Sequence, residues 1–194
     1  ARGQVTGPGI LWQRSHPAGV DYTSAAISVS AAKVVAGTSY GDPRQVELYE
    51  LDGPNVPLWV FPLPSGDEEV VVDAARNADV FAAASVNPNV SRVTLRRWFS
   101  GSATPAWTVL IAPATLSASP PDHLAVSHDG STVVLLTNDG IGDELRFFDA
   151  ADGSRLWQWE SVRATGRRGG PVRHVFIVGD TLYTPDALDL RTGQ

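Results

Sequence analysis

Cysteine and methionine are both absent from this chain of 194 residues, and its single lysine is Lys33. The lack of cysteine excludes disulfides, thiolate metal sites and a cysteine nucleophile. It leaves the redox compartment open, because a protein without cysteine is stable in either setting; of the alternatives, we favour an extracytoplasmic or secreted location. Since the chain starts at alanine and contains no methionine, we expect a processed product or an excerpt of a longer polypeptide.

Positive charge and long apolar runs are also scarce. Fifteen basic residues stand against 21 acidic ones, and the resulting net charge of −6 argues against a nucleic-acid partner. No stretch approaches the roughly 18 apolar residues that a membrane-spanning helix needs, and these residues contain no secretory signal peptide. Hydrophobic residues make up 43% of the chain, which is enough for a packed core.

What the sequence does contain is an internal repeat, marked by four tryptophans in matched contexts: Trp12, Trp59, Trp107 and Trp157. Their successive spacings of 47, 48 and 50 residues indicate a repeat of about 48 residues. Upstream of each of the last three tryptophans is a stretch of alternating polar and apolar residues, at 45–51, 92–99 and 144–149. A period of two is typical of a strand with one buried face.

Each repeat divides into four short strands. They are predicted near 24–30, 33–39, 45–51 and 57–61, then near 68–73, 79–85, 91–99 and 105–111, and then near 122–127, 131–137, 143–149 and 155–160. A fourth repeat has strands near 172–178, 181–184 and 187–190, and the chain ends before its tryptophan-bearing strand. The segment 9–14, which contains Trp12, is the strand that this repeat lacks.

Four antiparallel strands per repeat are typical of a β-propeller blade. We therefore predict an all-β fold, a β-propeller of four-stranded antiparallel blades with almost no helix. The chain supplies four blades, at about 15–61, 62–111, 112–160 and 161–194, the last completed by strand 9–14. Pairing the two ends of the chain in one sheet removes exposed sheet edges.

Three arrangements satisfy this pairing. One chain can close on itself, two chains can exchange strands and form one eight-bladed homodimeric ring, or the chain can be half of a longer polypeptide. Four-bladed rings are at the small extreme of propellers, so we prefer an eight-bladed ring, in which this chain is one half.

The turn from Asp149 to Trp157 (DAADGSRLW) resembles the tryptophan-docking motif of pyrroloquinoline-quinone-type propeller repeats, Ala-x-Asp-x-x-Thr-Gly-x-x-x-Trp. The segment 187–193 (ALDLRTG) matches this motif more fully, and 127–131 (SHDGS) also resembles turns of bacterial WD-type propellers. The resemblance implies that the four repeat tryptophans pack between neighbouring blades. It implies that the docking turns are shaped by Asp149, Gly153, Asp189 and Gly193.

The resemblance does not extend to the quinone. Enzymes of that family hold it on the ring axis with a stacked tryptophan, acidic calcium ligands and often a vicinal cysteine pair, whereas this chain has no cysteine and no acidic cluster at matching positions. We therefore predict no cofactor. The segment 37–41 (GTSYG) fits the G-x-S-x-G nucleophile pattern, but another strand rather than a helix follows it. We predict no catalytic residue.

Candidate metal ligands occur in one acidic loop, where Asp139, Asp143 and Glu144 offer carboxylates. Calcium needs six to eight oxygen ligands, and the loop departs from the calcium-loop spacing, so we prefer a solvated hairpin and predict no metal site. His123 and His128 lie five residues apart on and after a strand. Alternation places them on opposite sides, which argues against a joint metal site.

One basic run, 163–170, contains Arg167 and Arg168 and joins the third repeat to the fourth. Arginine binds carboxylates through its planar fork of donors, so these two residues are our first candidates for contact with a partner. Arg96 and Arg97 are adjacent on an alternating strand, which leaves one of them able to face outward.

Two functional hypotheses follow. The first is a non-catalytic binding or scaffold module that recognises a protein or another ligand through its loops, because the repeat is complete and no catalytic set converges. The second is a fragment of a propeller enzyme, either a quinoprotein dehydrogenase or a hydrolase. Fold alone does not decide between them.

Overall fold

The computed structural model describes residues 21–40, 44–54, 56–111, 123–138, 142–162, 176–178, 181–183 and 188–189. In this part of the chain the regular structure is strand, apart from one short 3₁₀ turn at Pro88–Val90. None of the helical structure found there is long and apolar enough to cross a membrane. The expectation of an all-β fold is confirmed.

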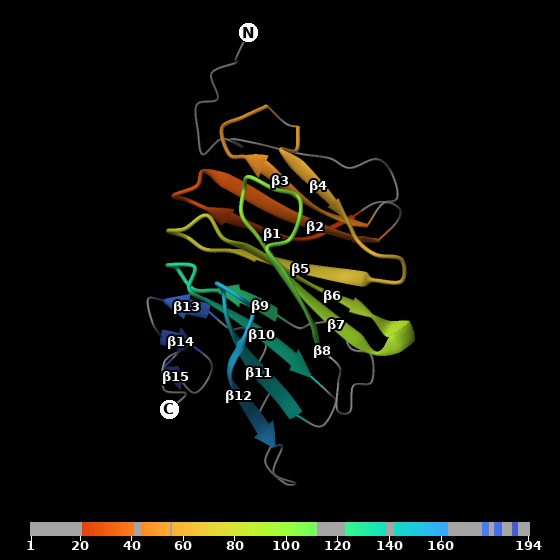
Figure 1. The fold of residues 1–194 in the computed structure, drawn as a ribbon, viewed down its shortest axis with the longest axis vertical. Coiled ribbons are helices and arrows are strands. Elements are labelled where there is room, and N and C mark those ends of the chain that lie inside the picture. Colours follow the sequence, from red (N-terminus) through yellow and green to blue (C-terminus); the bar gives the residue numbers. More distant parts are fainter. Residues whose placement is uncertain are drawn as a thin grey trace, which may run out of the picture.

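The strands form successive antiparallel meanders (Figure 1). Blade 1 consists of β1 (Asp21–Ser28), β2 (Lys33–Tyr40), β3 (Gln45–Glu50) and β4 (Trp59–Pro62). Blade 2 consists of β5 (Glu68–Ala74), β6 (Phe81–Asn87), β7 (Arg92–Trp98) and β8 (Trp107–Ile111). Blade 3 consists of β9 (His123–Val126), β10 (Thr132–Asn138), β11 (Gly142–Asp149) and β12 (Arg155–Val162). Blade 4 shows β13 (Phe176–Val178), β14 (Thr181–Tyr183) and β15 (Leu188–Asp189).

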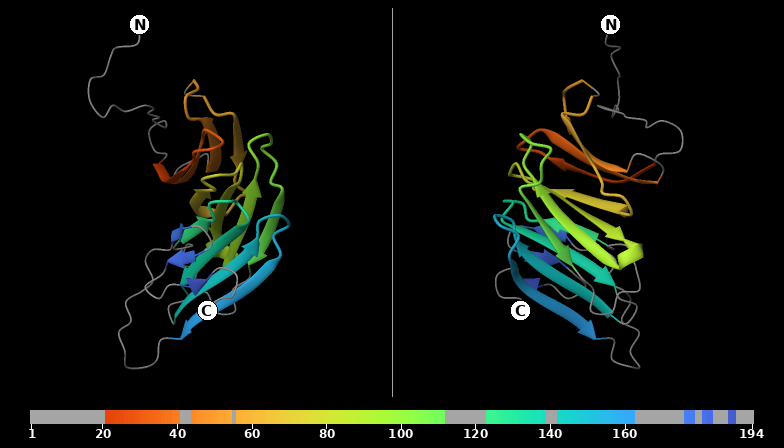
Figure 2. Two further views of the ribbon diagram at one scale, coloured as in Figure 1. Left: turned by 90° about the vertical axis from the view of Figure 1, so that its left-hand side faces the viewer. Right: turned by 45° about the vertical axis from the view of Figure 1, so that its right-hand side comes forward.

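The blades follow one another in sequence order. Figure 2 shows the first strands of blades 1 to 3 on one side of the molecule and the fourth strands on the other. The first strands β1, β5 and β9 contact one another in succession, and β13 contacts β9. Each strand lies near its predicted position, and the strand predicted at 9–14 lies outside the described residues.

The core of the described residues lies between the blades, because alternation gives the strands of blades 1 to 3 apolar side chains on both faces. Blades 1 and 2 share one cluster, in which Leu48 and Trp59 pack against Phe81 and Trp98. Blades 2 and 3 share a second, in which Leu95 belongs to the same group as Leu124, Leu135 and Phe148. Burying one such side chain stabilises the fold by about 1.5–3 kcal/mol, so blades 1 to 3 stabilise one another through these shared clusters.

One glycine shows how closely the blades approach. A Cβ atom on Gly37 in β2 would lie 2.6 Å from the Cγ1 atom of Val70 in β5. The neighbouring Thr38 is buried, and its hydroxyl accepts a hydrogen bond from the Gln45 backbone N–H. The G-x-S-x-G match at 37–41 therefore begins inside a strand that packs against the next blade, where the nucleophile pattern requires a strand–turn–helix junction.

The two adjacent arginines of β7 differ from expectation, since neither faces solvent. Arg96 is 4% exposed and Arg97 is 5% exposed. Arg96 points toward blade 1, where its guanidinium lies 5.5 Å from the centre of the Phe61 ring. Arg97 lies 3.6 Å over the ring of Phe99. Both faces of a middle blade are covered by other blades, so alternation in such a strand moves a side chain from one interface to another.

Candidate functional site

The first strands of blades 1 to 3 line a groove of about 590 Å³. Its walls are mostly aliphatic, and a few polar side chains project from β1, β5, β9 and the turns that follow them. The residues of this axial groove are Ser24, Ala25, Ile27, Val29, Val71, Val72, Asp73, Ala74, Arg76, His123, Leu124, Ala125, Val126 and His128. An apolar concavity with a few convergent polar groups is the usual form of a ligand site.

The turns between the first and second strands form the rim of this axial groove. Within them Val29, Arg76 and His128 occupy equivalent places in successive repeats. Main-chain hydrogen bonds join the turns, from the Ser30 N–H to the Arg76 carbonyl at 3.1 Å and from the Asn77 N–H to the His128 carbonyl at 2.8 Å. The three side chains therefore stand in a row on a backbone that is tied from blade to blade.

Asp73 is the carboxylic acid of the axial groove. One of its oxygens accepts a hydrogen bond of 2.7 Å from the Val126 N–H of blade 3. Burial raises the pKa of this carboxyl to about 6, although hydrogen bonds from the Val126 and Ala74 backbones oppose the rise. Between blades 1 and 2 the neutral hydroxyl of Ser24 has the corresponding role and accepts a hydrogen bond of 2.9 Å from the Val72 N–H.

His123 and His128 were expected on opposite sides, and instead both line the axial groove. Alternation holds only within a strand, and β9 ends at Val126, so the turn redirects His128. The described residues nevertheless contain no group of three or more acidic or histidine side chains placed to hold a metal ion.

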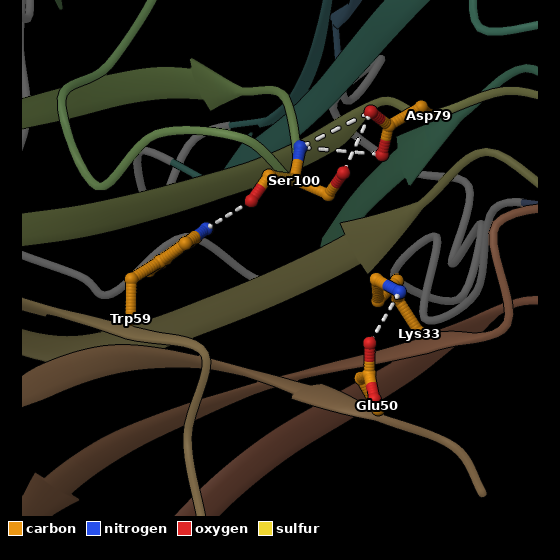
Figure 3. Close-up of polar contacts among 5 residues, drawn as sticks. All are labelled: Lys33, Glu50, Trp59, Asp79 and Ser100. Atoms are coloured by element: carbon orange, nitrogen blue, oxygen red, sulfur yellow. Dashed lines mark hydrogen bonds and ion pairs between the residues drawn. The ribbon is translucent and has the colours of Figure 1, made fainter. Parts of the chain in front are cut away.

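Trp59 lies at the junction of blades 1 and 2 (Figure 3). Its indole N–H donates a hydrogen bond of 3.0 Å to the Ser100 carbonyl in the turn between β7 and β8. The carboxylate of Asp79 holds that turn, because it accepts hydrogen bonds from both the backbone N–H and the hydroxyl of Ser100. Figure 3 also shows the ion pair of Lys33 and Glu50, 3.5 Å apart across β2 and β3.

Trp107 makes the equivalent contact at the junction of blades 2 and 3. Its indole N–H donates a hydrogen bond of 2.9 Å to the Ala150 carbonyl in the turn between β11 and β12. Asp149 shapes this turn by accepting a hydrogen bond of 2.7 Å from the Ala151 N–H. Gly153 has φ +77°, and a Cβ atom there would lie 2.9 Å from the Trp107 ring.

The remaining residues of the predicted docking set are Trp157, Asp189, Trp12 and Gly193. Trp157 stacks on Phe147 of its own blade, with ring centres 3.4 Å apart. The backbone of Asp189 lies in β15. Trp12 and Gly193 lie outside the described residues.

In the predicted acidic loop, the structure shows the side-chain contacts of Glu144. Both carboxylate oxygens of Glu144 accept hydrogen bonds from Arg146, at 2.7 and 2.6 Å. Asp143 belongs to β11, and Asp139 lies outside the described residues, as do Arg167 and Arg168. Glu144 is therefore engaged with a cation of its own strand.

Sequence reasoning missed a buried polar cluster at the junction of blades 1 and 2. Asp67, 1% exposed, pairs with Arg96 at 3.0 Å and accepts a hydrogen bond of 2.8 Å from the Ser85 hydroxyl. Burial lowers the pKa of the Arg96 guanidinium, and Asp67 opposes this effect.

A second buried cluster surrounds Glu47 in blade 1. Its carboxylate accepts hydrogen bonds from the Tyr22 and Tyr49 hydroxyls and from the Gln45 amide. The signal for both clusters is a polar face on the third strand of a four-stranded sheet, where solvent exposure is not expected.

No protein-family model matches the sequence, and no curated protein matches it significantly. Solved structures are similar in fold. Raptor from Chaetomium thermophilum superposes with a TM-score of 0.61 at 14% identity, covering 85% of this chain and 14% of that one. Sqt1 from Chaetomium thermophilum, bound to the N-terminus of ribosomal protein L10, gives 0.57 at 18% identity, covering 84% and 40%. The β-propeller domain of Cps50 (Swd1) from Myceliophteria thermophila gives 0.53 at 14% identity, covering 90% and 52%.

These similarities, together with the four-stranded antiparallel sheets, confirm the β-propeller fold. Identities this low carry no information on activity. The chain spans between 14% and 52% of the length of these three structures.

Proposed function

We propose that this β-propeller is a non-catalytic module that binds a protein partner through the turns and loops around its blades. The observation that carries the proposal is the row of linked turns at the rim of the axial groove. Side chains on turns that a rigid scaffold fixes are the usual carriers of recognition. Sqt1, which has the same fold, is bound to the N-terminus of another protein, so a propeller of this kind is a suitable receptor for an extended segment.

The enzyme alternative has less support from the residues around the axis. A quinone and its calcium ion need several acidic oxygen ligands, and the described residues of the axial groove offer the single carboxyl of Asp73, which already accepts a backbone hydrogen bond. These residues do not fit such a centre. We assign no reaction step to this groove.

Three finer proposals accompany this function. Trp12, Trp59, Trp107 and Trp157 dock each blade on the next, in the manner of quinoprotein-type repeats. The blades at about 15–61, 62–111, 112–160 and 161–194 complete a ring through strand 9–14, in an eight-bladed ring of two chains or of one longer chain. Arg167 and Arg168 add a contact for an acidic partner.

Selection from a displayed library of random peptides tests the function directly. We expect a family of peptides with a common motif to bind the intact protein with micromolar affinity. Reversing both charges, in the variant Arg167→Glu/Arg168→Glu, should weaken those peptides that use the basic loop. Failure to enrich any motif, together with quinone- and calcium-dependent dye reduction by the purified protein, would replace the binding hypothesis with the enzymatic one.

A further inference from the structure

The three rim turns present three different chemistries in equivalent places: an aliphatic side chain at Val29, a guanidinium at Arg76 and an imidazole at His128. Arg76 is exposed, and among the described residues its guanidinium has no hydrogen-bond or ion-pair partner. The imidazole of His128 likewise has no hydrogen-bond partner within the described part of the chain. Two nitrogen-rich side chains therefore stand beside each other at the mouth of a concavity with their donors unused.

An aliphatic surface continues this row on the blade 1 side. Ile27 is 52% exposed and Val29 is 61% exposed, and both line the axial groove. A ligand that covers large exposed aliphatic side chains gains binding free energy, because apolar surface is removed from water. The rim therefore combines an apolar half, on blade 1, with a nitrogen-donor half, on blades 2 and 3.

Among the described residues, the carboxylates near the rim do not pair with Arg76. The chain has a net charge of −6, yet the oxygens of the nearest acids are engaged with groups other than this guanidinium. Asp129, next to His128, is occupied by its own turn, since its Oδ1 atom accepts hydrogen bonds from Ser127 and Ser131. Asp73 is held deeper in the groove by the Val126 N–H, and its burial raises its pKa to about 6. Within the described ranges, the mouth of the groove therefore presents an arginine whose guanidinium is free to bind the carboxylate of a ligand.

We propose that the axial groove binds an acidic peptide segment in which a carboxylate side chain stands beside an aliphatic one. The carboxylate accepts hydrogen bonds from Arg76 and His128, and the aliphatic side chain covers Ile27 and Val29. This inference rests on the proposed function and names the chemistry of the partner. A volume of about 590 Å³ is within the usual range for a small ligand site and holds a few side chains of such a segment.

A peptide fits this rim better than a free anion for one reason. Guanidinium–carboxylate pairing alone would serve acetate, phosphate or any small dicarboxylate equally. The exposed aliphatic pair on blade 1 gives no advantage to those anions, whereas a segment that carries both chemistries uses the whole row. Recognition should therefore need the acid and the neighbouring aliphatic residue together.

The probe is a labelled peptide of alternating glutamate and leucine. The same peptide with glutamine in place of glutamate is the uncharged control. Fluorescence anisotropy measures both against the intact protein. We expect the glutamate peptide to bind at least tenfold more tightly than the glutamine peptide. Arg76→Gln should lower the affinity for the glutamate peptide about tenfold, because a charge-assisted hydrogen bond is lost. Val29→Asp should lower this affinity by a similar factor, because it places a negative charge next to the bound glutamate.

Arg155→Gln is the matched control, since Arg155 is an exposed arginine on the outer strand β12, away from the groove. It should bind the glutamate peptide as the unchanged protein does. Arg76 is also exposed, so thermal melts of the two variants should coincide and exclude unfolding as the cause of weaker binding. Millimolar phosphate or succinate should not displace the peptide; displacement by either would identify a general anion site instead.

Equal binding of the glutamate and glutamine peptides, or equal affinity in Arg76→Gln and Arg155→Gln, would overturn this inference. If library-selected peptides still bind the unchanged protein and are insensitive to Arg76→Gln, the binding function stands and this site does not carry it. If neither the defined probe nor any selected peptide binds, both proposals fail.

Discussion

At the junction of blades 1 and 2, the indole of Trp59 donates a hydrogen bond to the turn between β7 and β8. That turn has neither the aspartate nor the glycine of the docking motif at the equivalent places. At the junction of blades 2 and 3, the indole of Trp107 donates a hydrogen bond to the turn between β11 and β12, which has both residues. The indole donates to a carbonyl in either case, at 3.0 and 2.9 Å. The first turn is held from outside, by Asp79, and the second is held from within, by Asp149.

The two junctions also differ in what they bury beside the tryptophan. The first encloses the ion pair of Asp67 and Arg96, whose side chains are 1% and 5% exposed. The second has the pair of Glu144 and Arg146, whose side chains are 20% and 10% exposed. The repeat thus keeps one hydrogen bond at each junction and varies the groups around it, so the two junctions should respond differently to the same kind of substitution.

The largest difference is expected for the ion pairs. Asp67→Ala leaves the Arg96 guanidinium buried without its partner and should lower the free energy of unfolding by about 3–5 kcal/mol. Glu144→Ala should cost clearly less, because water reaches that pair. Urea denaturation at neutral pH measures both. Equal losses would show that burial does not distinguish the two pairs, and the double variant Asp67→Leu/Arg96→Met should recover much of the stability lost in Asp67→Ala.

Removal of the tryptophans should distinguish the two junctions less strongly. Trp59→Ala and Trp107→Ala each delete a large ring between blades, and losses of about 3–5 kcal/mol are typical of buried aromatics. Trp59, 9% exposed, should be nearer the upper end than the half-buried Trp107. Leu156→Ala, at a residue 48% exposed, is the control and should change little. An unchanged melting temperature in either tryptophan variant would contradict a docking role.

Strand positions could be predicted from the sequence because a period of two and a repeat near 48 residues constrain each other. The turn at 149–153 was also recognisable, since aspartate and glycine are the residues that such a turn requires. The turn after β7 was not, because it is held by Asp79, which is 21 residues away from Ser100. A contact between distant segments leaves no local pattern in the sequence.

The rim of the axial groove was hidden for a related reason. Val29, Arg76 and His128 share a place in the repeat but no residue type, so they become a set only when the blades are stacked. Alternation suggested that His123 and His128 diverge, and the turn after β9 brought both to the groove. The contact of Glu47 with Tyr22 was equally invisible, because Tyr22 comes from β1, whereas its other partners, Gln45 and Tyr49, lie on its own strand.

The first strands of the blades also differ between the two junctions, and this difference should make stability depend on pH. The Val126 N–H donates a hydrogen bond to the carboxyl of Asp73, whereas the Val72 N–H donates one to the neutral hydroxyl of Ser24. The pKa of Asp73 is raised from 3.8 to about 6, so between these values the folded state binds more protons than the unfolded state. Stability should therefore fall as pH rises from about 4 through 6 and level off above 7, by up to about 3 kcal/mol.

Asp73→Asn should abolish this dependence, since the amide oxygen can still accept the Val126 hydrogen bond and never carries charge. Urea denaturation of both proteins at pH 4.5 and 7.5 gives the four free energies of unfolding. The two proteins should differ little at the lower pH, and the variant should be the more stable at the higher one. Ser24→Ala, at the other junction, should leave the pH dependence as it is. A pH dependence that persists in Asp73→Asn would assign it to another group.

The smallest effect is expected in the docking turn itself. Gly153 has φ +77°, and an added Cβ atom would meet the Trp107 ring at 2.9 Å, so Gly153→Ala combines backbone strain with a displaced indole. We expect a loss of about 2 kcal/mol, which is within the usual cost of a residue held in a sparsely populated backbone region. The equivalent turn of blade 2 supplies the control, because a Cβ atom on Gly101 would have no neighbour within 4 Å. Gly101→Ala should be neutral or slightly stabilising. Tryptophan fluorescence during the same unfolding series should shift in Gly153→Ala and not in Gly101→Ala, and a neutral Gly153→Ala would mean that the turn of blade 3 does not depend on its glycine.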